Sequence, residues 1–214
     1  MLLLLNIDFE SAQEINNKLS IFKGNTFAKA AVEICWWTLQ TKITKTPLHK
    51  LLGGETKEVQ AGADFGIQDS IDMLLGNIQK AVDVGFPRVK LKVSRGWDLD
   101  VLKAVRSTFP DLILHIDCNG GYSLEDIALF KEIDKLNLIF IEQPLHFADV
   151  LDHSELAKSI DTPICLDESI TSIKSAKDAI KVNACKFINI KPGRVGGLYN
   201  SIEINKLARE NGIP

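Results

Sequence analysis

The segment LILHIDCNGG, residues 112–121, joins an apolar run to an acidic residue and then to a turn. Asp117 ends this run, and the same arrangement recurs along the chain. Lys92, Glu142, Asp167 and Lys191 also end short apolar runs. Taken in chain order, the first three steps between these five residues are 25 residues each and the last is 24. A repeat of this length has room for one strand and one helix.

Six apolar runs predict strands: Val59–Ala63, Arg88–Lys92, Leu112–Asp117, Leu138–Glu142, Pro163–Asp167 and Cys185–Lys191. Amphipathic stretches between and after them predict helices: Ser70–Val84, Asp98–Thr108, Ser123–Leu136, Val150–Ser159, Ser172–Val182 and Gly197–Asn211. Several of these stretches begin with a residue that favours the helix N-cap, such as Asp98, Ser123 and Ser172. Strands that alternate with helices predict a parallel sheet with right-handed crossovers.

The five residues at the ends of these runs should therefore lie at one end of the sheet. In a parallel barrel this is the catalytic face. A doubly wound open sheet is the alternative, but it would divide consecutive strand ends at a switch point. We therefore predict an α/β fold, a (β/α) TIM-type barrel. A complete barrel has eight strands and about 250 residues. We expect about six strands here, so the barrel is incomplete and the chain is a fragment of a longer protein.

Residues 1–55 differ from the rest because they lack the alternation of strand and helix. Residues 10–20 and Phe27–Lys42 predict two helices, and Pro47 with Gly53-Gly54 closes the segment. We expect a domain boundary between residues 55 and 56.

The composition excludes several classes of function. The 214 residues are 45% hydrophobic and 25% charged, and the net charge is −3. No basic surface is expected, so neither nucleic acid nor an anionic membrane is a predicted partner. The leucines in Met1–Leu5 are too few for a membrane span or a signal peptide. The four cysteines have no metal-binding spacing, which favours free thiols and a cytoplasmic protein.

Three of the strand-end residues are carboxylates: Asp117, Glu142 and Asp167. Three carboxylates that converge are unfavourable unless a cation binds them. Oxygen ligands without His or Cys favour Mg²⁺, or Mn²⁺, over zinc. The alternative is that each acid only caps the next helix, but three acids in the same phase make this the weaker interpretation.

Lysines precede and follow these acids. Lys90 and Lys92 are two residues apart on one predicted strand and so share a face. Lys92 and Lys191 should lie on opposite sides of the barrel mouth and could act on opposite faces of one substrate. Asn119 could donate a hydrogen bond to a substrate carboxylate, or could simply be a turn residue before Gly120-Gly121. We interpret residues 193–197 as a tight turn and not as a phosphate-binding loop.

These residues resemble motifs of the enolase superfamily, in its muconate-lactonizing subgroup. The matching pieces are Lys90-Leu91-Lys92, Asp117-Cys118-Asn119, Glu142-Gln143-Pro144, Asp167-Glu168-Ser169 and NIKPGRVGG at residues 189–197. Within the subgroup, the last piece and the segment CLDESI at residues 165–170 resemble o-succinylbenzoate synthases and N-succinylamino acid racemases. The resemblance implies that residues 1–55 form the C-terminal part of an α+β capping domain. Residues 56–214 would then be a partial (β/α)₇β barrel.

The resemblance also implies roles for the site residues. Asp117, Glu142 and Asp167 would bind Mg²⁺, Lys92 would remove the proton α to a substrate carboxylate, and Lys90 and Asn119 would contact the substrate. In a synthase, Lys191 would stabilise the intermediate by its charge, whereas in a racemase it would be the second acid/base.

Several functions agree with these roles. Dehydration to o-succinylbenzoate, a step of menaquinone biosynthesis, is the first expectation. Racemisation of N-succinyl or other N-acylamino acids comes next, and dipeptide epimerisation third. An inactive barrel scaffold is the non-enzymatic alternative. We expect a small-molecule carboxylate as substrate and a homo-oligomer for the full-length protein.

Overall fold

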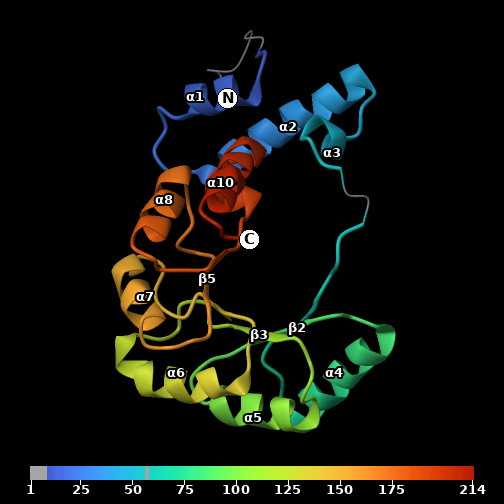
Figure 1. Ribbon diagram of the computed structural model, residues 1–214. Helices are drawn as coiled ribbons and strands as arrows, with labels where there is room; N and C mark the ends of the chain where they lie inside the picture. Colours follow the sequence, from blue (N-terminus) through green and yellow to red (C-terminus); the bar gives the residue numbers. More distant parts are fainter. Residues whose placement is uncertain (1–8, 56–57) are drawn as a thin grey trace.

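The computed structural model describes residues 9–55 and 58–214 (Figure 1). The prediction about Met1–Leu5 lies outside the described residues. Six parallel strands form one sheet: β1 (Ala63–Phe65), β2 (Val89–Lys92), β3 (Leu114–Asp117), β4 (Ile141–Glu142), β5 (Ile164–Leu166) and β6 (Phe187–Ile188). Each strand pairs with the next one in the chain, in the order β1-β2-β3-β4-β5-β6. This sequential order confirms the predicted α/β fold with an incomplete parallel sheet and excludes the doubly wound alternative.

The helices follow the predicted stretches closely. Those between and after the strands are α4 (Ile71–Val84), α5 (Leu99–Thr108), η2 (Leu124–Asp126), α6 (Ile127–Ile133), η3 (Asp134–Leu136), α7 (Val150–Ala157), α8 (Ile173–Lys181), α9 (Pro192–Val195) and α10 (Leu198–Glu210). Before the sheet lie α1 (Ala12–Leu19), α2 (Thr26–Thr44) and α3 (Leu48–Leu51). Ser172 caps α8 by accepting a hydrogen bond from the N–H of Ser175, and Asp98 accepts one from the N–H of Leu99 at the start of α5.

The two faces of the sheet have different environments. Figure 1 shows α4 to α8 in an arc along the outside of the strands. Leu91, Ile116 and Ile141 point to this side and pack in one buried core with Leu102 of α5 and Phe130 of α6. The opposite face carries the polar and aromatic side chains. Because neighbouring residues of a strand alternate between faces, the apolar core fixes which residues point to the inner face.

Two features differ from the predicted elements. The first strand is Ala63–Phe65 and not Val59–Ala63, because pairing with β2 begins where the N–H of Ala63 donates to the carbonyl of Arg88. Val59 is 89% exposed, so its β-branched side chain gave a misleading signal. Residues 193–197, predicted as a turn, form the short helix α9 and then turn at Gly196 (φ 91°).

Glu33 connects the front helices to the rest of the fold. It lies on α2 and is buried, and its Oε1 accepts hydrogen bonds from the backbone N–H of Tyr199 at 2.7 Å and from Nε1 of Trp37 at 3.0 Å. The carboxylate thus occupies the N-terminal end of α10, where free N–H groups favour negative charge. A Cβ atom at position 197 would collide with this carboxylate, so the close approach requires Gly197.

The domain boundary between residues 55 and 56 remains a prediction, and residue 56 itself is outside the described residues. Within the described residues, no helix is both long enough and apolar enough to span a membrane.

Asp134 joins the segments that lead into β4 and β5. It accepts hydrogen bonds from the backbone N–H of Asp161 at 3.0 Å, and from the N–H and hydroxyl of Thr162 at 2.7 and 2.6 Å. Burial alone would raise the pKa of Asp134, but these hydrogen bonds outweigh it and the pKa falls below its usual 3.8. The ionised carboxylate therefore stabilises the folded state above the unfolded pKa.

We predict that Asp134→Asn lowers the free energy of unfolding at neutral pH by about 1–2 kcal/mol. The difference from the wild type should shrink as the pH falls through the folded pKa, because the wild-type carboxylate is then protonated too. Urea unfolding between pH 7 and pH 3 measures this. Asp69→Asn, at an exposed aspartate, is the control and should have little effect. A difference independent of pH would contradict the interpretation.

Candidate active site

Three buried carboxylates lie side by side at the carboxyl ends of the strands. Asp117 ends β3, Glu142 ends β4, and Asp167 follows β5 directly. They are 1%, 2% and 0% exposed. The pairing register places Lys92 opposite Asp117 and Asp117 opposite Glu142. The strands thus place Asp117 beside Glu142, with Asp167 at the end of the next strand, and the charges of these buried acids must be compensated within the protein.

Lys90 compensates two of these carboxylates. Its Nζ lies 2.8 Å from Oδ2 of Asp117 and 2.8 Å from Oε2 of Glu142. Burial alone would lower the pKa of Lys90, but the two carboxylates outweigh it and raise the pKa well above its ordinary value. Burial would likewise raise the pKa of Asp117, but Lys90 and the N–H of Asn119 lower it. Both groups are held in their charged forms.

Asp167 is compensated by two cations that follow β6. Nζ of Lys191 lies 2.7 Å from its Oδ2. Arg194, on α9, contacts both carboxylate oxygens, with its second nitrogen 3.2 Å from Oδ2. A guanidinium that contacts both oxygens fixes the plane of the carboxylate. Lys191 and Arg194 thus both contact one of the three acids, and the catalytic role of Lys191 remains a prediction.

Lys92 lies at the more open side of the same site. Its Nζ donates to Oδ1 of Asn119 at 2.6 Å and is 3.5 Å from Oδ2 of Asp117. Nδ2 of Asn119 in turn donates to Oδ2 of Asp117 at 3.2 Å and to Oε1 of Glu168 at 3.0 Å. Both donors of Asn119 are thus used inside the protein. Its predicted contact with substrate remains a prediction.

Gln143 holds the backbone around these acids. It is fully buried between β4 and β5, with φ at 39°. Its Oε1 accepts hydrogen bonds from the N–H groups of Asp167 and Ser169, at 3.0 and 3.1 Å. Its Nε2 donates to the carbonyl of Leu145 at 3.0 Å and to the hydroxyl of Ser169 at 2.8 Å. One side chain therefore fixes the ends of two neighbouring strands.

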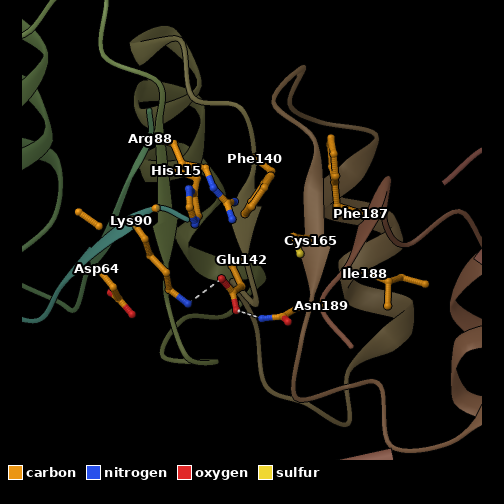
Figure 2. Close-up of a pocket in the computed structure, with 12 residues that line it drawn as sticks. Asp64, Arg88, Lys90, His115, Phe140, Glu142, Cys165, Phe187, Ile188 and Asn189 are labelled. Atoms are coloured by element: carbon orange, nitrogen blue, oxygen red, sulfur yellow. Dashed lines mark hydrogen bonds and ion pairs between the residues drawn. The ribbon is translucent and has the colours of Figure 1, made fainter. Parts of the chain in front are cut away.

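A cavity of about 390 Å³ opens on the inner face of the sheet, and Glu142 is the one of the three acids that lines it. Figure 2 shows Lys90 and Asn189 on either side of Glu142, with Nδ2 of Asn189 donating to Oε1 of Glu142 at 2.8 Å. Deeper in the cavity, the ring of His115 lies 4.4 Å from that of Phe140. Burial, with the nearby positive charges of Arg88 and Lys90, lowers the pKa of His115 to about 4, so the imidazole is neutral at pH 7.

A larger cavity, of about 520 Å³, lies at the opposite end of β5, between the segments of α7 and α8. It is lined by none of the predicted site residues. The smaller cavity is lined by Glu142 and Lys90, and these two predicted site residues distinguish it as the candidate site although it is not the larger space.

The three acids offer oxygen ligands for a divalent cation. Their oxygen chemistry fits Mg²⁺, and one ammonium group already bridges two of them at 2.8 Å, so a single cation can reach both. In the part of the chain that the structure describes, however, no group of three His, Cys, Asp or Glu side chains is close enough to form a metal shell as placed. A bound ion would have to displace the Lys90, Lys191 or Arg194 side chain from the carboxylate oxygens that it contacts.

Several residues of the site were not predicted from the sequence. Asn189 and Lys191 are two residues apart, a spacing that could have indicated a shared face. Glu168 and Gln143 each follow a predicted metal ligand directly, and no periodicity separates them from ordinary loop residues. Arg194 reaches the site only because α9 forms, and four helical residues give no sequence signal.

Known proteins with similar sequences include racemases and synthases. The N-succinylamino acid racemase of Thermus thermophilus is 41% identical over 210 residues, which are 98% of this chain and 57% of the racemase. The o-succinylbenzoate synthase of Geobacillus kaustophilus is 42% identical over 201 residues, which are 94% of this chain and 54% of the synthase. The chain thus spans about half the length of these curated relatives.

Solved structures show the same fold. A member of the enolase superfamily from Listeria innocua superposes with a TM-score of 0.92 at 38% identity, over 97% of this chain and 56% of that one. A dipeptide epimerase of Enterococcus faecalis, solved with Mg and the dipeptide L-Leu-L-Tyr, gives a TM-score of 0.86 at 25% identity, over 95% of this chain and 60% of that one. The family described as enolase C-terminal domain-like matches residues 74–214. This chain therefore belongs to the enolase C-terminal domain-like family.

Proposed function

We propose that the protein catalyses Mg²⁺-dependent removal of a proton α to a carboxylate, and that the reaction is dehydration to o-succinylbenzoate. The observation that carries the proposal is the placement of the buried acids Asp117, Glu142 and Asp167 at the ends of three neighbouring strands. Lys92 lies 3.5 Å from Asp117, and Lys191 lies 2.7 Å from Asp167. Relatives named o-succinylbenzoate synthase at about 40% identity support this choice of reaction.

Asp117, Glu142 and Asp167 would hold the metal ion, whose charge would stabilise the negative charge that develops on the substrate carboxylate. Lys92, as the neutral amine, would take the α-proton. The bond from the adjacent carbon to its hydroxyl would then break, and Lys92 would return the proton to the departing oxygen, so that water and an aromatic product form. Lys191 would lie on the other side and contribute positive charge.

Racemisation of an N-succinylamino acid is the second candidate, because a relative with this name is 41% identical. In that reaction Lys92 and Lys191 would each exchange a proton with one face of the same carbon. Dipeptide epimerisation is the third candidate and uses the same two lysines.

The direct test is an assay of the full-length protein with Mg²⁺. We expect conversion of the hydroxylated cyclohexadiene carboxylate to the aromatic product, followed by ultraviolet absorbance. N-succinylamino acids, followed by optical rotation, test the second candidate in parallel. If no aromatic product forms although N-succinylamino acids racemise, the synthase assignment is wrong and the racemase assignment takes its place.

Mg²⁺ should stabilise the folded chain. At a concentration about 100 times its Kd, a ligand that binds only the folded state adds about 2.7 kcal/mol, which corresponds to a rise in Tm of about 5 °C or more. We predict this rise for the wild type and its loss in Asp167→Asn, measured by differential scanning calorimetry with and without Mg²⁺. Asp178→Asn, on the outer helix α8, should keep the rise. An equal rise in Asp167→Asn would exclude Asp167 as a ligand.

Lys191→Arg separates the two candidate reactions. Arginine keeps the positive charge but does not release its proton at accessible pH. A reaction that needs only charge at this position should lose no more than about tenfold in kcat, whereas one that needs proton transfer should lose about 100-fold or more. We therefore expect dehydration to persist and racemisation to fail. Lys186→Arg, at an exposed lysine, is the control, and equal losses of both reactions would contradict the assigned roles.

A further inference from the structure

Glu168 is a half-buried carboxylate next to Asp167 that none of the proposed steps uses. Its Oε1 accepts one hydrogen bond, from Nδ2 of Asn119 at 3.0 Å. Its Oε2 is buried and has no hydrogen-bond partner among the described residues. A carboxylate kept in this state for a single contact requires an explanation, because buried polar atoms without partners are unfavourable.

The single contact of Glu168 fixes the orientation of the Asn119 amide. Oδ1 of Asn119 faces the ammonium of Lys92 at 2.6 Å, and Nδ2 faces Glu168 and Asp117. A flipped amide would set its NH₂ group against an ammonium and its oxygen against two carboxylates. All of these contacts would be repulsive. The contact with Glu168 is the shorter of the two on Nδ2, and Asp117 is already shared with Lys90.

We propose that Glu168 is a positioning residue for Lys92 and acts through Asn119. The chain of contacts runs from Glu168 on the segment after β5, across the amide of Asn119 after β3, to Lys92 at the end of β2. These contacts hold the Lys92 side chain in one position at the site, although that side chain is 42% exposed. Lys191 is 46% exposed and is held by Asp167 and not by this chain of contacts. The importance of this chain of contacts for catalysis rests on the proposed function, in which Lys92 is the base.

The test measures the two lysines separately, without turnover. Each protein is treated with a low concentration of N-hydroxysuccinimidyl acetate, and acetylation of Lys92 and Lys191 is followed by peptide mass spectrometry. We expect Glu168→Leu to raise the labelling rate of Lys92 about three- to tenfold, because one charge-assisted hydrogen bond is weakened. Lys191, of similar exposure, should be unchanged. Glu168→Gln keeps an acceptor for Asn119 and should stay within about twofold of the wild type.

A double substitution tests the path. Asn119→Gly removes the amide and tolerates the left-handed backbone at this position (φ 43°). It should raise Lys92 labelling by itself, and adding Glu168→Leu should then have no further effect. Glu203→Leu, which removes a carboxylate from α10, is the control for loss of a glutamate elsewhere. If Glu168→Leu does not fold, as judged by circular dichroism, Glu168→Ser supplies the same truncation with a polar side chain.

Three results would overturn the proposal. These are unchanged Lys92 labelling in Glu168→Leu, an equal rise at Lys92 and Lys191, and a further rise when Glu168→Leu is added to Asn119→Gly. In the active protein, Glu168→Leu should also slow formation of the aromatic product, and with an N-succinylamino acid it should slow α-proton exchange in D₂O more for the enantiomer that faces Lys92 than for the other. Absence of both aromatic product and α-proton exchange in the wild type would refute the proposed function, while the labelling result would still decide the role of Glu168.

Discussion

The arrangement of the site depends on burying three carboxylates at the ends of three neighbouring strands. Each of Asp117, Glu142 and Asp167 is almost fully removed from solvent, and an isolated charge in that position would be strongly unfavourable. Lys90 meets this requirement for two of the acids, and Lys191 with Arg194 meets it for the third. Such pairs contribute little net stability, but removal of one partner leaves an uncompensated buried charge. The acids and cations therefore depend on one another.

This dependence extends beyond the sheet to the front helices. Arg194 reaches Asp167 only because α9 turns the chain back toward the strand ends after β6. α9 is in turn enclosed by α2, since the ring of Phe27 packs against Gly193 and the carboxylate of Glu33 occupies the start of α10. The position of the Arg194 guanidinium thus depends on residues of α2, which lie more than 150 residues earlier in the chain. Substitutions in α2 can disturb the site without touching it.

The sequence was sufficient to predict the parts that follow from periodicity. Spacings of 25 residues placed Lys92, Asp117 and Glu142 correctly at the ends of strands, since strand ends repeat with the βα unit. Asp167 and Lys191 were predicted as strand ends too, but Asp167 directly follows β5 and Lys191 lies three residues after the end of β6. The predicted position of β1 was wrong, because a strand of three residues gives too short a sequence pattern. The partners of the acids were not predictable either. Lys90 was expected to contact substrate but bridges two acids, and the contact of Glu168 with Asn119 spans 49 residues with no local signal.

The site combines a rigid part with an adjustable part. Gln143 and the strand pairing fix the backbone that carries the acids, so their positions vary little once the sheet forms. Lys92 and Lys191 are long side chains, each more than 40% exposed, and their ammonium groups are held only by side-chain contacts. The proposed dehydration and racemisation would use the same acids but would require different behaviour of these two lysines. The choice between the reactions can therefore depend on residues such as Asn119 and Glu168, which set how a lysine is held, while the motif of acids and lysines stays unchanged.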